Sequence, residues 1–248
     1  MKKLVAISLL IAVVAVSLLV QRSVSSQEAT WKAKSKRGDA VRALVVTGGH
    51  DHDSEFYSVF DDENIKAVVD PHPAVFGGDI RKRADVLVLY DMMKTLDEKR
   101  RKNLQAFVEN GKGVVVLHHA IGDNVDWPWW YEEVVGGRYL FEPVNGKAGS
   151  YKHDVDLTIK PAMQHPILKG ITPFHIHDET YKNLWISPKV KVLLTTDNPT
   201  SDGPVAWISP YEKSRVVYIQ LGHDRNANLN PNWQRLVRNA IQWAAGRL

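Results

Sequence analysis

Histidines gather at the ends of apolar segments that have the character of strands. His118 and His119 close the run GVVVLHH, and His223 follows the run RVVYIQLG. His50 and His52 come directly after the run VRALVVTGG. Imidazole acts as an acid, a base or a metal ligand near neutral pH. The grouping therefore predicts a site with one of these chemistries.

The adjacent pair His118 and His119 has two interpretations. Successive side chains of a strand point to opposite faces, so only one of the pair can face a given site. We expect His119 to face the site as a base or a metal ligand. His118 either contacts the substrate as well or donates a hydrogen bond to a backbone carbonyl in the core.

Two more segments contain candidate binding groups. As a strand, HIHDE places His175 and His177 on one face and Asp178 on the other. We expect the two histidines to be structural, with a metal pair as the alternative. In DNVDWPWWYEEVVGG, Trp127 and Trp130 either close the core or present a flat apolar face to a sugar ring.

Two isolated histidines receive no place in the site. His165 precedes a proline, which favours an extended or turn conformation, and we expect it to be structural. His72 lies between two prolines in a predicted loop.

A sheet must bring the candidate residues together. Between two apolar runs, Thr95 and Glu98 form a capping box for a helix that ends before Gly111. A strand, this helix and a second strand make a right-handed βαβ unit. Four runs are rich in Val and Leu without polar alternation, as parallel strands buried on both faces are, and they cover residues 41–49, 65–70, 84–91 and 113–119.

The second half of the chain is richer in predicted strands. The runs are HDVDLTI, VKVLLTT, PVAWIS and RVVYIQLG, and some alternate as antiparallel or edge strands do. A final helix has Asn230 as its cap and Pro231 in its first turn. We therefore expect a three-layer α/β/α sandwich with a mainly parallel central sheet over residues 41–248. Ligands collect at the carboxyl ends of the strands in such sheets.

The N-terminal region has the layout of a targeting segment. An unbroken apolar run, residues 4–20, follows Met1 and two lysines. Residues 1–26 are predicted to be a secretory signal peptide or an uncleaved membrane anchor, and residues 27–40 a basic linker. We therefore expect a periplasmic or extracellular domain, with residues 4–20 as a membrane tether if they are not cleaved.

Composition excludes several classes of function. Residues 1–37 hold seven basic side chains and one acidic one, and the remainder holds 25 basic and 27 acidic ones. A basic groove for nucleic acid is therefore not expected. The chain has no cysteine, which excludes a disulfide framework, a thiolate metal site and a cysteine nucleophile. No G-x-S-x-G motif supplies a serine in its place.

Five short motifs, in this order, resemble those of the ThuA-like family, which is named for trehalose utilisation. This family is related in fold to the flavodoxin-like class I glutamine amidotransferases. In those relatives a cysteine follows the central strand, and His119 takes that place here, which excludes a thioester glutaminase. The motifs are VVTGGHDHD, GVVVLHHA, QHPILKGI, HIHDETYKN and IQLGHD, which begin at residues 45, 113, 164, 175 and 219.

The resemblance implies carbohydrate catabolism, with 3-keto-disaccharides among the substrates. Cleaving a glycosidic bond beside a ketone by elimination needs a base, an acid for the leaving oxygen and a group that stabilises the enolate. We assign His119 as the base and Glu179 or Asp178 as the acid or orienting carboxylate. Tyr181, which the family motif adds, joins His118, Trp127 and Trp130 as the expected contacts of a small carbohydrate.

Two alternatives accompany this prediction. One divalent ion (Zn, Mn, Fe or Ni), held by His50, His119 and His223, would polarise the ketone instead. The chain could also be a non-catalytic module that binds a sugar or a metal. A cluster of titratable imidazoles favours an enzyme, a glycoside hydrolase or lyase, because sugar binding alone gains little from such groups.

Overall fold

The computed structural model describes residues 39–92 and 95–248, and the compact unit within it runs from Asp39 to Leu248. The predicted leader, residues 1–26, lies outside the described residues, as does nearly all of the predicted linker, residues 27–40. None of the helices in the described ranges has the length and apolar character that a membrane span requires.

A nine-stranded sheet runs through the described domain in the order β2-β1-β3-β4-β11-β10-β9-β6-β7. The first five strands of this order are parallel, and the remaining pairings are antiparallel. A separate small pair consists of β5 (Gly137–Arg138) and β8 (Trp185–Ile186). The strands of the large sheet are β1 (Val41–Gly48), β2 (Ile65–Pro71), β3 (Val86–Asp91), β4 (Gly113–Leu117), β6 (Ser150–Pro161), β7 (Phe174–Lys182), β9 (Lys191–Thr195), β10 (Pro204–Ile208) and β11 (Val216–Ile219).

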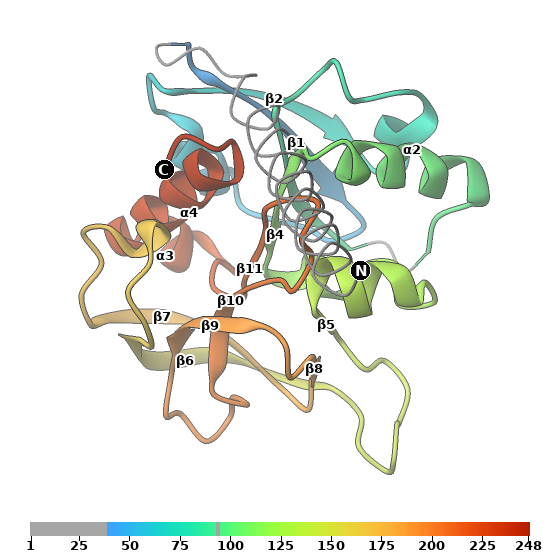
Figure 1. The fold of residues 1–248 in the computed structure, drawn as a ribbon. Helices are drawn as coiled ribbons and strands as arrows, with labels where there is room; N and C mark the ends of the chain where they lie inside the picture. The colour runs from blue at the N-terminus through green and yellow to red at the C-terminus, as the bar shows by residue number, and fades with distance from the viewer. Residues whose placement is uncertain (1–38, 93–94) are drawn as a thin grey trace, which may run out of the picture. The chain divides into compact units, whose positions relative to one another are not determined.

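Helices cover both faces of the parallel strands. Figure 1 shows α2 and α4 on opposite sides of β1 and β4. Val45 of β1 packs in the same core cluster as the apolar face of α4, whereas Val46 packs in the cluster that contains the buried residues of α2. The predicted three-layer sandwich is therefore confirmed. The helices are η1 (Ser54–Phe60), η2 (Ala74–Gly77), α2 (Glu98–Glu109), η3 (His118–Gly122), η4 (Trp129–Val135), η5 (Pro166–Leu168), α3 (Arg225–Asn228) and α4 (Pro231–Ala244).

Two details of the predicted strands are wrong. β2 is an edge strand and is not buried on both faces, since Val68 is 58% exposed and Val69 is 43% exposed. β4 ends at Leu117, two residues before the predicted end, so His118 and His119 begin the short helix η3.

The helix ends show which predicted cap forms. Asp97, not Thr95, caps α2, because the Asp97 carboxylate accepts a hydrogen bond from Arg100 N. The Thr95 hydroxyl instead donates to Asp126. The predicted cap of α4 is confirmed, since the Asn230 side chain accepts from Asn232 N.

The antiparallel ribbon of β6 and β7 carries carboxylates to the ends of the parallel strands. Its pairing with β9 involves only Lys160 and Pro161 of β6. Further along the ribbon, the Tyr181 hydroxyl of β7 lies 2.9 Å from His118 Nε2. Asp178 accepts a hydrogen bond of 2.8 Å from Gly222 N, just beyond β11. The ribbon therefore crosses the carboxyl ends of β4 and β11.

Candidate functional site

The turn after β4 brings both adjacent histidines to one site. His118 has a left-handed backbone conformation, with φ of 49°. Because the strand stops at Leu117, the alternation of side chains expected for a strand no longer applies to the pair. Both rings are buried beside the ends of β4 and β11, and neither is turned to the opposite face of the sheet.

His118 has a defined tautomer. Its Nδ1 lies 2.5 Å from the carbonyl oxygen of Gln220, and because a carbonyl only accepts, Nδ1 carries the proton. Its Nε2 is therefore an acceptor, 2.9 Å from the Tyr181 hydroxyl and 3.1 Å from His223 Nδ1. Burial holds the pKa of His118 well below its usual range, which keeps the imidazole neutral.

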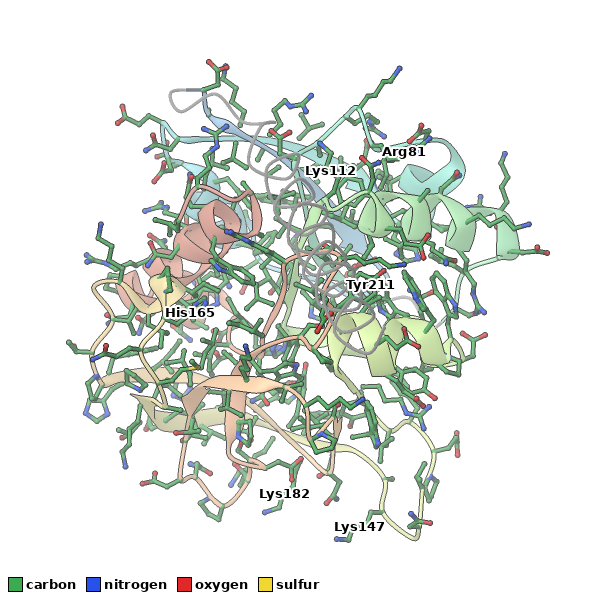
Figure 2. The ribbon with its side chains drawn as sticks, viewed as in Figure 1. Arg81, Lys112, Lys147, His165, Lys182 and Tyr211 are labelled. Carbon is green, nitrogen blue, oxygen red and sulfur yellow. The ribbon has the colours of Figure 1, made fainter. Side chains whose placement is uncertain are left out.

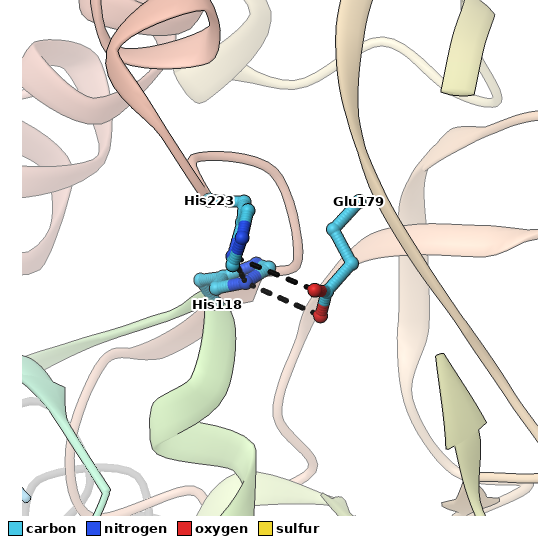
Figure 3. A group of neighbouring side chains, drawn as sticks. All are labelled: His118, Glu179 and His223. Atoms are coloured by element: carbon cyan, nitrogen blue, oxygen red, sulfur yellow. Dashed lines mark hydrogen bonds and ion pairs between the residues drawn. The ribbon is translucent and has the colours of Figure 1, made fainter. Parts of the chain in front are cut away.

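Glu179 faces three histidines, two of which Figure 3 shows. Its carboxylate lies 3.6 Å from His118 Nε2 and 3.5 Å from His223 Nδ1. The shortest contact, 2.6 Å, is with Nδ1 of His153 on β6. Burial raises the pKa of Glu179 to about 7, although a hydrogen bond from Tyr181 opposes the shift. No pattern in the sequence indicates His153, since its closeness to Glu179 depends on the pairing of β6 with β7.

Asp178 holds the backbone that carries His223. Its carboxylate accepts hydrogen bonds from the backbone N–H groups of Glu179 (2.8 Å), Gly222 (2.8 Å) and His223 (3.0 Å). Burial raises the pKa of Asp178 to about 7, and these three donors oppose the shift. Asp178 therefore matches the orienting carboxylate of the two roles predicted for it.

His119 presents an unsatisfied imidazole. It is 4% exposed, and neither ring nitrogen has a hydrogen-bond partner among the described residues. Its ring stacks on His50 with 4.5 Å between centroids and lies 4.6 Å from the ring of Tyr90. Burial lowers the pKa of His119 to about 3, and the nearby His50 adds to this effect. His52 turns elsewhere and lies 2.8 Å from the Tyr57 hydroxyl.

A pocket of about 380 Å³ opens over these groups. Its volume falls within the range of small-molecule sites in proteins. One part of its lining is polar and titratable, and another part is apolar and aromatic. The polar part contains His50, His119, His153 and Glu179, and the apolar part contains Met92, Ile121, Tyr139, Phe141, Tyr151 and Tyr181, whose hydroxyl points to His118.

Trp127 and Trp130, the predicted sugar contacts, do not line this pocket. Trp130 is buried in the core cluster on the α2 face of the sheet, and Trp127 packs against that cluster. The Arg101 guanidinium covers the Trp127 ring at 5.3 Å from its centroid. The prediction is corrected because the chain turns away after η3, and Tyr139, Phe141 and Tyr151 supply the aromatic surface instead.

The described residues contain two groups that could hold a metal ion. In the first, ligand atoms of His118, Glu179 and His223 lie within 4.8 Å of one another. The predicted set shares only His223 with this group, because His50 and His119 stack on each other beside it. The second group contains His72, which was predicted to have no role, together with Asp91 and Asp123.

The other predicted histidines lie outside the pocket. His175 and His177 share a more exposed face of β7, and His177 Nδ1 lies 2.8 Å from Asp156. His165, labelled in Figure 2, accepts a hydrogen bond from Ile167 N and packs its ring against Trp243 of α4. Its surroundings match the expected structural role.

Comparison with solved structures places this fold among known ones. A ThuA-like protein from Parabacteroides merdae has 20% identity and a TM-score of 0.70, with 84% of this chain and 90% of that chain covered. A ThuA-like protein from Bacteroides uniformis has 19% identity and a TM-score of 0.64, with 86% and 94% covered. The amidotransferase relationship is represented by a GMP synthase protein from Thermoplasma acidophilum, with 11% identity, a TM-score of 0.53 and 85% and 96% covered.

The family comparison agrees with these structures. No curated protein matches the chain. The family model ThuA, described as trehalose utilisation, matches residues 26–244. Five motifs in order, the sandwich fold and this match lead to one conclusion: the chain belongs to the ThuA family.

Proposed function

We propose that the chain is an enzyme that cleaves a glycosidic bond in a carbohydrate that carries a ketone, as a hydrolase or lyase. One observation carries the proposal: a single pocket contains the buried carboxyl group of Glu179 and the unpartnered imidazole of His119. A carboxyl group with a pKa of about 7 transfers protons in either direction near neutral pH. The amidotransferase chemistry of the fold's relatives is not proposed, because the chain has no cysteine.

The residues divide the work of an elimination. Glu179 removes the proton on the carbon beside the ketone, and the electron pair of that C–H bond moves onto the ketone oxygen as an enolate. His119, kept neutral by its low pKa, donates an N–H hydrogen bond to this oxygen. When the enolate collapses, the glycosidic C–O bond breaks, and the leaving oxygen takes the proton from Glu179. Addition of water to the enone product would complete a hydrolysis.

This division changes the role first assigned to His119. A pKa of about 3 makes its imidazole a weak base but leaves its N–H available as a donor. His153 contacts Glu179 at 2.6 Å and is 48% exposed, so it connects the carboxyl group to solvent protons. Tyr181 donates to His118 and thereby orients the wall beside Glu179.

The shape of the pocket supports a sugar ring as the occupant. Sugars have an apolar face of C–H groups and an edge of hydroxyl groups. Tyr139, Phe141 and Tyr151 provide aromatic surface for the face, while His50 and His153 provide hydrogen-bonding groups for the edge. We therefore propose a small-molecule carbohydrate as the partner, and no nucleic acid.

A metal-assisted enzyme is the second candidate, favoured by the spacing of His118, Glu179 and His223. Two imidazoles and one carboxylate suit Zn, Mn, Fe or Ni. The bond from His118 Nδ1 to the Gln220 carbonyl leaves Nε2 free as a ligand, as the outer contacts of metal-bound histidines do. A bound ion would polarise the ketone.

The test is a screen of 3-keto-disaccharides and their unoxidised parents against the full-length chain, with chelator or with each metal. We expect release of the free sugar from keto-substrates only. Cleavage in chelator supports the proton-transfer scheme, whereas cleavage only with an added ion supports the metal candidate. Saturable binding without turnover under every condition would overturn the enzyme and favour a sugar-binding module.

We also propose a periplasmic or extracellular location, on the basis of the apolar run in residues 4–20. Cell fractionation and N-terminal sequencing test it. A mature chain that begins near residue 27 indicates cleavage, and an intact chain in the membrane fraction indicates a tether. An intact chain in the cytoplasmic fraction would contradict the proposal.

A further inference from the structure

We propose that His72, Asp91 and Asp123 bind a divalent cation at a second site, separate from the pocket. Ligand atoms of the three residues lie within 4.8 Å of one another, and all three residues are buried. None of them lines the pocket. This inference does not depend on the proposed enzymatic function.

The site lies where the strand order changes direction. His72 follows β2, and Asp91 ends β3, so the two residues flank the end of β1 from opposite sides. Open α/β sheets bind ligands at such points, outside the carboxyl ends of their strands. Asp123 follows η3 and completes the group from the direction of β4.

Two glycines at the end of β1 allow these flanking residues to meet. Gly48 and Gly49 have φ of 126° and 75°, which side chains rarely tolerate. A Cβ atom on Gly49 would lie 2.2 Å from the carbonyl oxygen of Met92. Backbone hydrogen bonds of 2.9 Å from His72 N to Thr47 and from Met92 N to Gly48 hold the two sides. The contact between His72 and Asp91 is therefore built into the sheet.

The group has polar atoms that the described protein does not satisfy. His72 Nδ1 contacts one oxygen of Asp91, and their side chains are 1% and 0% exposed. His72 Nε2 and the second oxygen of Asp91 have no hydrogen-bond partner. A buried polar atom without a partner costs free energy, and an uncompensated buried charge costs more. A cation bound by this group would offset both costs.

The donors indicate which cation fits. One imidazole nitrogen and carboxylate oxygens suit Zn or Mn, and a fully buried position is typical of a structural ion. Met92 and Gly122, the chain neighbours of Asp91 and Asp123, both line the pocket. An ion here would therefore fix the two backbone segments that form one side of the pocket.

Zinc binding to the full-length chain tests the site. The chain is purified without a tag, stripped with chelator and dialysed against Zn²⁺, and bound zinc is measured by elemental analysis. We expect Asp91→Asn and His72→Gln each to bind one ion fewer than the wild type. Asp126→Asn, which changes an exposed carboxylate three residues from Asp123, should bind as many ions as the wild type.

A variant of the pocket keeps the test decisive if Asp91→Asn does not fold. Glu179→Gln leaves the second site intact, so it should still bind one ion and unfold at a higher temperature with Zn²⁺ than with chelator. Zinc-free Glu179→Gln, or a folded Asp91→Asn that binds the wild-type number of ions, would overturn the site. One wild-type ion that Asp91→Asn loses and Glu179→Gln keeps supports the site and removes the metal candidate for the pocket.

Discussion

At the scale of the residue, two adjacent histidines have opposite surroundings. His118 has partners for both ring nitrogens, whereas His119 has none among the described residues. The difference follows from the end of β4 at Leu117 and from the hydroxyl of Tyr181, which reaches His118 from β7. His119 is left with an imidazole that only a pocket ligand or water can satisfy.

The buried His119 should make stability depend on pH. Burial lowers its pKa to about 3, while in the unfolded chain the group titrates near its ordinary 6.5. Between these values the unfolded chain binds more protons, so the free energy of unfolding falls as the pH falls from about 6.5. One such group contributes up to about 1.4 kcal/mol per pH unit. Urea denaturation of the chelated protein between pH 4 and 7 should show a shallower slope for His119→Gln than for the wild type.

The control for this slope is His175→Gln, which changes an exposed ring on β7 and should keep the wild-type dependence. Equal slopes for wild type and His119→Gln would contradict the stated protonation of His119.

Asp178 should matter through the backbone that it holds. Asp178→Asn replaces one acceptor oxygen by an amide nitrogen, which cannot accept from Gly222 N or His223 N. A buried donor left without a partner costs about 1–3 kcal/mol. Denaturant unfolding should show this loss for Asp178→Asn but not for Asp156→Asn, whose carboxylate is exposed. Equal stability of Asp178→Asn and the wild type would remove the positioning role.

At the scale of the element, α2 shows how a sequence signal can select the wrong residue. Thr95 and Glu98 have the spacing of a capping box, but Asp97 caps the helix. Asp97→Ala should therefore lower the free energy of unfolding by about 1 kcal/mol. Thr95→Ala should cost less, because it removes only an exposed hydrogen bond to Asp126. Thermal unfolding of both variants checks the order, and a larger loss for Thr95→Ala would reverse the assignment.

The end of β1 should not tolerate a side chain. Gly49→Ala places Cβ 2.2 Å from Met92 O in a left-handed backbone, so the two strand ends must separate. We expect a loss of at least about 1–3 kcal/mol in the free energy of unfolding, the cost of a strained backbone alone. Gly77→Ala is the matched control, since a Cβ atom there meets nothing within 4 Å. Similar losses for the two variants would contradict the close approach.

At the scale of the whole molecule, local patterns predicted the fold better than the site. Valine-rich runs and the C-terminal helix indicated the parallel sheet and its layers, because burial on both faces leaves a direct mark in the sequence. The β6 and β7 ribbon leaves no such mark of where it crosses. The contacts of Glu179 with His153 and of His72 with Asp91 depend on strand order and on that crossing. Neither contact follows from spacing along the chain.

The most direct measurement is the rate at which the full-length chain releases free sugar from a 3-keto-disaccharide, compared with that of Glu179→Gln. General acid–base groups contribute about 10²–10⁴ to the rate. We expect Glu179→Gln to lose turnover by this factor while it keeps its fold and binds the substrate, and His177→Gln, outside the pocket, to keep the wild-type rate. A folded Glu179→Gln that turns over as fast as the wild type would contradict the account.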